Sequence, residues 1–265
     1  MAKLVKNGVM LLDEKGLRND GRRWDELRPI KMTTGVLERA DGSAIVETGG
    51  TKVLAAVYGP REVYPKHLAV PDKAIFRVAY RMASFSVEER KKPQPSRREI
   101  ELSKVIKEAI EPAIFLEQFP RTVIDAYVLV LQADGGTRVA SINAVSLALA
   151  DAGIPMKGLV SAIAVGRLGN QVIVDLNDVE DKYGDSDMPI AMIPITGEIT
   201  LFQMDGTMNP EIFEKCLEVA KQAISEIYKM QREVLRRKYL SIKEQVLKGD
   251  VNDIGDKKGD TKQNR

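Results

Sequence analysis

The sequence is poor in the residues that build disulfides and zinc sites. Its 265 residues include one cysteine, Cys216, and one histidine, His67. A single cysteine excludes an intrachain disulfide and suits a reducing compartment, so we expect a cytoplasmic protein. Tetrahedral zinc sites draw mainly on cysteine and histidine, and a structural zinc site is therefore not expected.

Long hydrophobic runs are absent as well. No stretch of about 18 consecutive apolar residues occurs, which argues against a membrane-spanning helix. The opening Met-Ala-Lys-Leu-Val-Lys-Asn-Gly contains no apolar core of a signal peptide. The net charge of +2 is too small to mark the whole chain as a nucleic-acid binder, so a local basic patch must hold any anionic partner.

The chain does contain enough apolar material for a sizeable core. Its hydrophobic fraction is 44%, and its length suits one large domain or two small ones. Apolar runs bounded by turn residues predict strands at residues 44–48, 52–58, 75–82, 123–132, 159–168, 171–176, 189–194 and 198–204. Helical spacing predicts helices from 97 to about 112, at 140–152 and from 210 to about 238. This order indicates an α+β fold with helices packed on mixed sheets.

Two adjacent arginines open one of these helices. Ser96 and Glu99 match a capping box, which places Arg97 and Arg98 in the first helical turn. The positive end of the helix dipole disfavours cations there, and a bound phosphate would compensate for them. The alternative is a solvated basic turn paired with Glu99 and Glu101.

A glycine turn precedes the next helix. In Asp134-Gly-Gly-Thr137-Arg138, the glycines allow close backbone approach to an anion. The N–H groups of Gly136 and Thr137, the Thr137 hydroxyl and Arg138 form a candidate oxyanion cradle. An ordinary strand-to-helix turn is the alternative.

A third polar segment, residues 175–187, is expected to be an acidic loop between apolar strands. Its carboxylates, Asp181 and Asp187 among them, suit Mg²⁺ binding or general acid catalysis, although most acidic loops are simply solvated. A further loop carries Lys66 and His67. We assign Lys66 a phosphate contact there and regard His67 as incidental.

Four ordered motifs resemble the RNase PH family. They are Gly16-Leu-Arg-Asn-Asp20-Gly-Arg-Arg-Trp-Asp25-Glu, Pro95-Ser-Arg-Arg-Glu99, Asp134-Gly-Gly-Thr-Arg138 and Glu180-Asp181-Lys-Tyr-Gly-Asp-Ser-Asp187-Met-Pro189. The resemblance runs from about Gly16 to Lys238, which is most of the chain. Within that family, the last motif and Glu101-Leu-Ser-Lys104 look most like the catalytic ring subunit of the archaeal RNA exosome.

The resemblance implies a fold, a reaction and partners. Residues 16–240 would form an RNase PH fold, related to domain 2 of ribosomal protein S5, between an N-terminal extension (1–15) and a disordered charged tail (241–265). The activity would be phosphate-dependent 3′→5′ degradation of single-stranded RNA to nucleoside diphosphates and, in reverse, RNA tailing. A related inactive subunit would alternate with this one in a hexameric ring, capped by S1/KH or zinc-ribbon subunits.

The resemblance also implies residue roles. Arg97, Arg98 and Lys66 would bind RNA, and Gly136, Thr137 and Arg138 the inorganic phosphate co-substrate. Many members carry Ser where this chain has Thr137, and a hydroxyl is kept. Asp181 would be the general acid, with its pKa raised by Asp187, and both are candidate Mg²⁺ ligands.

Two other functions remain open at this point. A stand-alone RNase PH-type enzyme that trims tRNA 3′ ends would be an active homohexamer. A non-catalytic ring subunit that only grips RNA should lack the aspartate pair or the glycine turn, and this chain has both.

Overall fold

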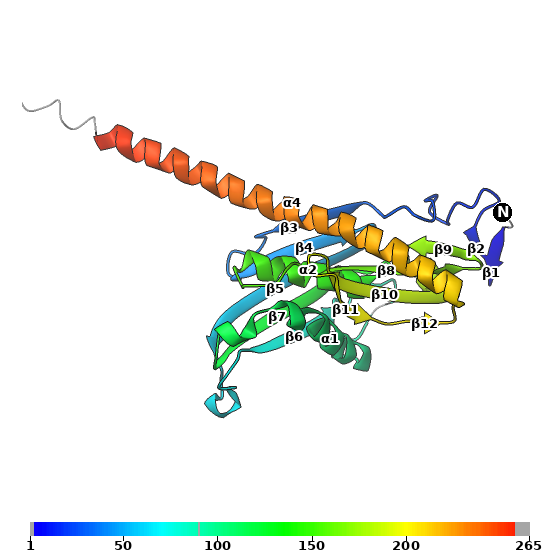
Figure 1. Ribbon diagram of the computed structural model, residues 1–265, viewed down its shortest axis with the longest axis horizontal. Coiled ribbons are helices and arrows are strands. Elements are labelled where there is room, and N and C mark those ends of the chain that lie inside the picture. The colour runs from blue at the N-terminus through cyan, green and yellow to red at the C-terminus, as the bar shows by residue number, and fades with distance from the viewer. Residues whose placement is uncertain (1–2, 90, 258–265) are drawn as a thin grey trace, which may run out of the picture.

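The computed structural model describes residues 3–89 and 91–257, which build two five-stranded sheets and a short N-terminal hairpin (Figure 1). The first sheet has the order β3-β4-β5-β7-β6, and the second the order β11-β10-β8-β9 with β12 beside β10. The strands are β1 (Leu4–Lys6), β2 (Val9–Leu12), β3 (Ile30–Thr34), β4 (Gly42–Thr48), β5 (Thr51–Glu62), β6 (Ile75–Met82), β7 (Thr122–Gln132), β8 (Ser161–Leu168), β9 (Gln171–Val174), β10 (Ser186–Ile193), β11 (Glu198–Phe202) and β12 (Asp205–Gly206).

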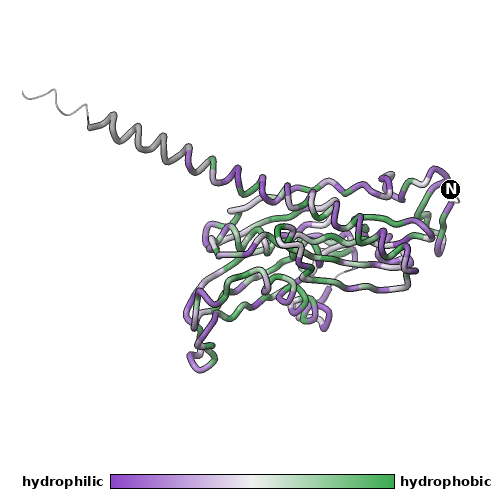
Figure 2. Tube along the Cα trace, in the orientation of Figure 1, coloured by the Kyte–Doolittle hydropathy of each residue, from purple (hydrophilic) through white to green (hydrophobic). Residues whose placement is uncertain are grey.

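Sheets and helices alternate as layers. Helices α1 (Arg97–Ile110) and α2 (Thr137–Asp151) pack between the two sheets, and α4 (Pro210–Lys257) covers the opposite face of the second one. Hydrophobic residues follow the strands of both sheets (Figure 2). This arrangement confirms the expected α+β class.

The β6–α1–β7 unit of the first sheet positions two of the predicted motifs, the arginine pair and the glycine turn. Its strands are antiparallel except β6 and β7, which run parallel because the chain crosses over through α1 between them. The crossover includes the short helices η2 (Glu111–Ala113) and η3 (Leu116–Gln118). The start of α1 and the turn after β7 therefore lie at the same end of the sheet.

Helix α2 is the centre of the core. Its residues from Val139 to Leu149 are all buried, and Ile142, Leu147 and Leu149 have no exposed surface. A helix that is buried on all sides fits only between two packed layers. It begins at Thr137 rather than near residue 140, because the glycine turn leads directly into it.

Helix α4 is longer than the sequence predicted. It begins as expected, with the Ile212 N–H donating to Asn209 Oδ1 (2.8 Å) and Pro210 in the first helical position. It extends past residue 238 through Lys257 and projects beyond the body (Figure 1). Residues 241–257, where a disordered tail was expected to begin, continue this helix, and 258–265 lie outside the described residues.

Two further segments contain secondary structure that the sequence did not predict. The acidic segment is not a continuous loop, because it contains helix α3 (Asp178–Tyr183), and Asp187 belongs to β10. The N-terminal extension includes the β1–β2 hairpin, which is anchored by Lys6 to Asp185 (2.5 Å). Within the described residues, no helix is both long and apolar enough to cross a membrane.

Candidate active site

The N-terminus of α1 is fixed by the predicted capping box. The Glu99 N–H donates to Ser96 Oγ (3.3 Å), and Ser96 N–H donates to the Glu99 carboxylate (2.6 Å). The same carboxylate accepts the Met82 N–H (2.8 Å), which ties the helix to the end of β6. Arg97 and Arg98 follow with exposed side chains, at a helix end rich in free N–H donors.

The glycine loop, residues 134–138, forms the N-terminus of α2. Gly135 and Gly136 have φ angles of 71° and 65°, a left-handed conformation that favours glycine. Thr137 Oγ1 accepts a hydrogen bond from the Tyr80 hydroxyl (3.1 Å), which leaves its own proton available to a ligand. Arg138 Nη1 donates to Gln203 Oε1 (2.5 Å), so its side chain is oriented from the second sheet.

The acidic segment supplies the carboxylates. A second capping box, between Asn177 and Glu180, starts α3 and leaves Asp181 exposed on that short helix. Asp187 lies at the start of β10 and is half-buried. Two different elements therefore present the two predicted catalytic side chains.

All three motifs meet in one cavity of about 190 Å³. Its lining includes Arg98, Gly136, Thr137, Arg138, Asp181 and Asp187. An adjoining hollow shares Arg98, Arg138 and both aspartates and extends to Gln203 and Asp205. The structure thus places cations, free backbone donors and carboxylates around one volume.

The two aspartates differ in how far their surroundings raise the pKa of the carboxyl group. Burial, and then repulsion from Asp181, raise the pKa of Asp187 to about 6, against the attraction of Arg138. Asp181 reaches water, but the cavity walls withdraw part of its hydration and raise its pKa, which Arg98 partly offsets. We expected repulsion from Asp187 to raise the pKa of Asp181. The larger rise in pKa is instead at Asp187, because its side chain is the more buried of the two.

Two buried polar atoms in this cavity are suited to contact a ligand. Arg138 Nε and Asp187 Oδ1 have no hydrogen-bond partner within the described part of the chain. Buried polar groups are almost always paired, by protein, water or ligand. The Arg138 Nε–H group is a donor suited to a phosphate oxygen. The Asp187 Oδ1 atom is an acceptor suited to a cation or a proton donor.

A metal ion at this site would need ligands from the substrate as well as from the protein. Among residues 3–89 and 91–257, no group of three or more His, Cys, Asp or Glu side chains is placed to hold a metal. Mg²⁺ commonly uses one or two carboxylates together with substrate phosphates and water. Asp181 and Asp187 fit that pattern and do not form a complete protein cage.

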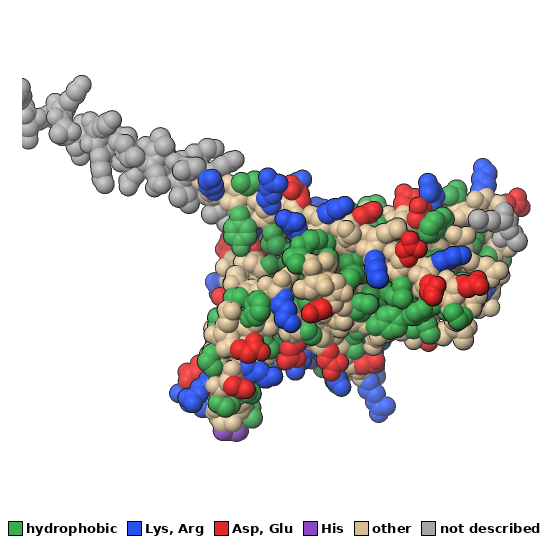
Figure 3. Space-filling view, viewed as in Figure 1, with side chains coloured by type: hydrophobic (Ala, Val, Ile, Leu, Met, Phe, Trp, Pro, Cys, Tyr) green, Lys and Arg blue, Asp and Glu red, His purple; other side chains and the backbone are tan. Residues whose placement is uncertain are grey.

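Lys66 and Arg97 are not brought to the cavity lining of this chain. Lys66 lies in the short helix η1 (Lys66–Leu68), at the tip of a projection that also carries the histidine, coloured purple in Figure 3. It is exposed and pairs with Glu62 (2.7 Å). Arg97 is also exposed, beside Arg98 on the rim.

Sequence reasoning missed Lys91, Tyr80 and Gln203. Lys91 lines the cavity, and its Nζ lies 3.0 Å from Met82 Sδ. Its place in the basic run before Pro93 was the available signal. Tyr80 lies in β6 and Gln203 directly after β11, with no local signal at either position, and their contacts with Thr137 and Arg138 arise only from tertiary packing.

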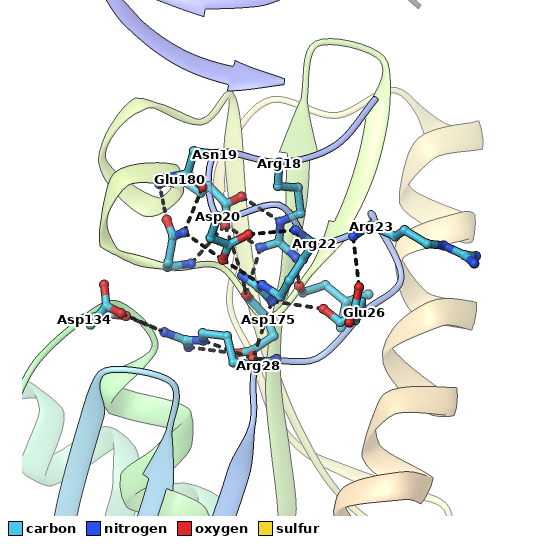
Figure 4. Close-up of polar contacts among 12 residues, drawn as sticks. Arg18, Asn19, Asp20, Arg22, Arg23, Glu26, Arg28, Asp134, Asp175 and Glu180 are labelled. Carbon is cyan, nitrogen blue, oxygen red and sulfur yellow. Dashed lines mark hydrogen bonds and ion pairs between the residues drawn. The ribbon is translucent and has the colours of Figure 1, made fainter. Parts of the chain in front are cut away.

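Three buried arginines, two in the N-terminal motif and one just after it, lie behind the site. Arg18, Arg22 and Arg28 have relative exposures of 2%, 8% and 5%, respectively. They form a connected network with Asp175 and Glu180 (Figure 4). The network joins the N-terminal segment to the acidic segment and to the glycine loop.

Comparisons with known proteins agree with these observations. Residues 26–155 match domain 1 and residues 158–223 match domain 2 of the 3′ exoribonuclease family, RNase PH. The protein named exosome complex component Rrp41 is 57% identical in Thermococcus kodakarensis (90% of this chain, 96% of the relative) and 52% in Nitrosopumilus maritimus (89% and 96%). The crystal structure of rice Rrp46 matches with a TM-score of 0.73 at 32% identity, over 81% of this chain and 98% of that one. With both domains of the family matched, and with close relatives along nearly their whole length, this chain belongs to the RNase PH family of 3′ exoribonucleases.

Proposed function

We propose that this chain is a phosphate-dependent 3′→5′ exoribonuclease subunit of an exosome ring. It degrades single-stranded RNA to nucleoside diphosphates and, in reverse, adds RNA tails. The observation that carries the proposal is the shared cavity, in which Arg98, the glycine loop and both aspartates converge. The relatives named exosome components support the same assignment.

In the proposed reaction, orthophosphate is the nucleophile. The N–H groups of Gly136 and Thr137, the Thr137 hydroxyl and Arg138 hold it. One of its oxygens bonds to the phosphorus of the last phosphodiester, while the bond from that phosphorus to the 3′ oxygen of the preceding nucleotide breaks. Asp181 donates its proton to that 3′ oxygen. The products are a nucleoside diphosphate and an RNA one nucleotide shorter.

The cations act on the charge of the transferring phosphoryl group. Arg98 lines the cavity beside the carboxylates and faces the charge that builds up there. Asp187, joined by Asp181 when that carboxyl group is ionised, would hold Mg²⁺ together with substrate oxygens, and the ion would supply further neutralisation of the same charge. The raised pKa values of both aspartates fit a site that needs such a cation or a donated proton.

RNA is held mainly through its backbone. Arg97 and Arg98 contact phosphates near the 3′ end, and Lys66, on its projecting tip, contacts the strand farther away. Contacts of this kind favour single strands and give little base preference.

The proposed partners complete the RNA path. A related inactive RNase PH-like subunit alternates with this chain in a hexameric ring, and S1/KH or zinc-ribbon subunits cap it. The single, buried Cys216 is compatible with the proposed cytoplasmic location. The assembled cavity argues against a subunit that only grips RNA. The stand-alone tRNA-trimming enzyme differs from the proposed subunit in its assembly, because it would be an active homohexamer without a partner chain.

The test is a digest of single-stranded RNA by the assembled complex with and without orthophosphate. We expect nucleoside diphosphates that appear only when phosphate is present. Nucleoside monophosphates without phosphate would indicate hydrolysis and contradict the proposal. A complex carrying Asp72→Asn, an exposed carboxylate outside the cavity lining, serves as the matched control and should behave like the parent.

A further inference from the structure

Arg28 connects the two halves of the site. Its Nη1 donates to the carbonyl oxygen of Asp134, the first residue of the glycine loop. Its Nε and Nη2 donate to the carboxylate of Asp175 at 3.0 and 2.7 Å, and its backbone N–H donates to the same group at 2.9 Å. One buried guanidinium therefore binds the glycine loop on one side and the start of the acidic segment on the other (Figure 4).

The surrounding chain is shaped to admit this side chain. A Cβ on Gly49, whose φ is 55°, would lie 2.6 Å from Arg28 Cδ. A Cβ on Gly136 would lie 3.1 Å from Arg28 Nη2. Arg28 thus lies directly against the loop glycine whose N–H group is proposed to hold orthophosphate.

Arg18 and Arg22 complete the support on the acidic side. Arg18 donates to the Glu180 carboxylate through Nε (2.6 Å) and Nη2, and to the carbonyl oxygens of Val174 (2.6 Å) and Asp175 (2.9 Å). Arg22 Nη2 donates to the same Asp175 carbonyl (3.1 Å). Glu180 immediately precedes Asp181, so the α3 backbone that carries the proposed acid is held by these contacts.

The glycine loop and α3 also touch each other. A Cβ on Gly135 would lie 2.5 Å from the carbonyl carbon of Asn177, so these backbones are in contact. A displacement of the loop therefore changes the distance between bound orthophosphate and Asp181. Misplacement by about 1 Å can cost about 10²-fold in rate.

We propose that Arg28 is a positioning residue, which fixes the glycine loop relative to the acidic segment and so sets the orthophosphate affinity of the site. This role rests on the proposed phosphorolytic function. An arginine is needed because its planar fork binds a carbonyl and a carboxylate at once, whereas a lysine ammonium offers one point charge. Lysine at this position would keep the charge beside Asp175 and lose the second connection.

The test uses Arg28→Lys in the full chain, assembled with its ring partner. Turnover is measured against orthophosphate concentration, and orthophosphate and RNA binding are measured separately by calorimetry. We expect the KM and the dissociation constant for orthophosphate to rise about tenfold or more, with RNA affinity within about twofold of the parent. The double variant Arg28→Gln/Asp175→Asn, which leaves no unpaired buried charge, should show the same pattern.

The control is Lys238→Gln/Asp151→Asn, which removes an ion pair at the other end of α2. It should leave orthophosphate affinity unchanged. Unchanged orthophosphate affinity in Arg28→Lys, or a parallel loss of RNA affinity, would overturn the positioning role while the parent remains active. A parent complex without phosphate-dependent turnover would instead overturn the proposed function, and the role of Arg28 with it.

Discussion

Asp181 and Asp187 carry the same functional group and differ in their surroundings. Asp181 reaches water beside Arg98, and Asp187 is half-buried with one oxygen unpaired among the described residues. The pKa of Asp187 rises to about 6 because burial and the neighbouring carboxylate both disfavour its charge. The exposed Asp181 is the better placed of the two to exchange a proton with solvent and substrate.

At this scale, Asp181→Asn should abolish turnover and preserve RNA binding. The amide keeps the size of the side chain and cannot donate a carboxylic proton, and loss of one positioned acid costs about 10²–10⁴ in rate. Single-turnover digestion of a labelled RNA measures the effect, with Asp72→Asn as the control. Degradation at nearly the parent rate would show that Asp181 is not the acid.

The two arginines at the start of α1 should behave differently. Arg98 lines the cavity and faces the carboxylates, so Arg98→Ala should lower turnover at saturating RNA. Arg97 lies on the rim, and Arg97→Ala should mainly reduce RNA affinity and make the salt slope shallower by about 0.7. Binding titrations across a salt series and initial rates separate the two effects.

Arg39→Ala, at an exposed position in the loop after β3, is the matched control for both arginines. Equal effects of Arg97→Ala and Arg98→Ala on turnover would contradict the difference inferred from the cavity. Binding and rates unchanged in both variants would favour the solvated basic turn.

At the scale of elements, the turn from β7 into α2 has the tightest steric requirement. Gly135→Ala should impair orthophosphate binding and lower the melting temperature, because the new Cβ meets the Asn177 backbone at 2.5 Å. Gly197→Ala is a matched control, since Gly197 has a similar φ of 75° and nothing within 4 Å of the added Cβ. It should show only the conformational cost, about 1–3 kcal/mol.

Orthophosphate titration and thermal melting of both glycine variants test this prediction. The difference between the two variants measures the contact between the glycine loop and α3, free of the backbone strain that they share. If both lose the same stability and both bind orthophosphate normally, the close approach of loop and helix has no role in the site.

At the scale of the molecule, exposed apolar surface remains on the first sheet. Tyr127 and Leu129 on β7 are 51% and 37% exposed, while their buried neighbours Ala126 and Val128 face the core. On the edge strand β11 of the second sheet, Ile199 and Phe202 are also exposed. Exposed apolar surfaces of this kind are typical of contacts with another subunit.

We therefore expect the isolated chain to degrade RNA poorly. Addition of the related inactive subunit should give a hexameric ring with strong phosphate-dependent activity, because several subunits are needed to build the RNA path. Light scattering and the RNA digest measure both properties. Robust activity of the purified chain as a homohexamer would instead favour the stand-alone tRNA-trimming enzyme.

The sequence by itself determined the local structure of this protein. Ser96 with Glu99, the glycines before Thr137, and Asn209 with Pro210 act through neighbours a few residues away, so helix starts and turns could be predicted from them. The four ordered motifs also identified the family. Predictions were less accurate where no local signal exists, as in the helix inside the acidic segment and the length of α4.

Only the tertiary structure decided how these parts work together. Arg98, Thr137 and Asp187 are far apart in the chain. The crossover within the first sheet and the packing of the second sheet bring them to one cavity. The pKa of Asp187 depends on burial and on Asp181, and the role inferred for Arg28 depends on contacts with residues more than 100 positions away. Burial and long-range contact are properties of the packed chain, and no local pattern contains them.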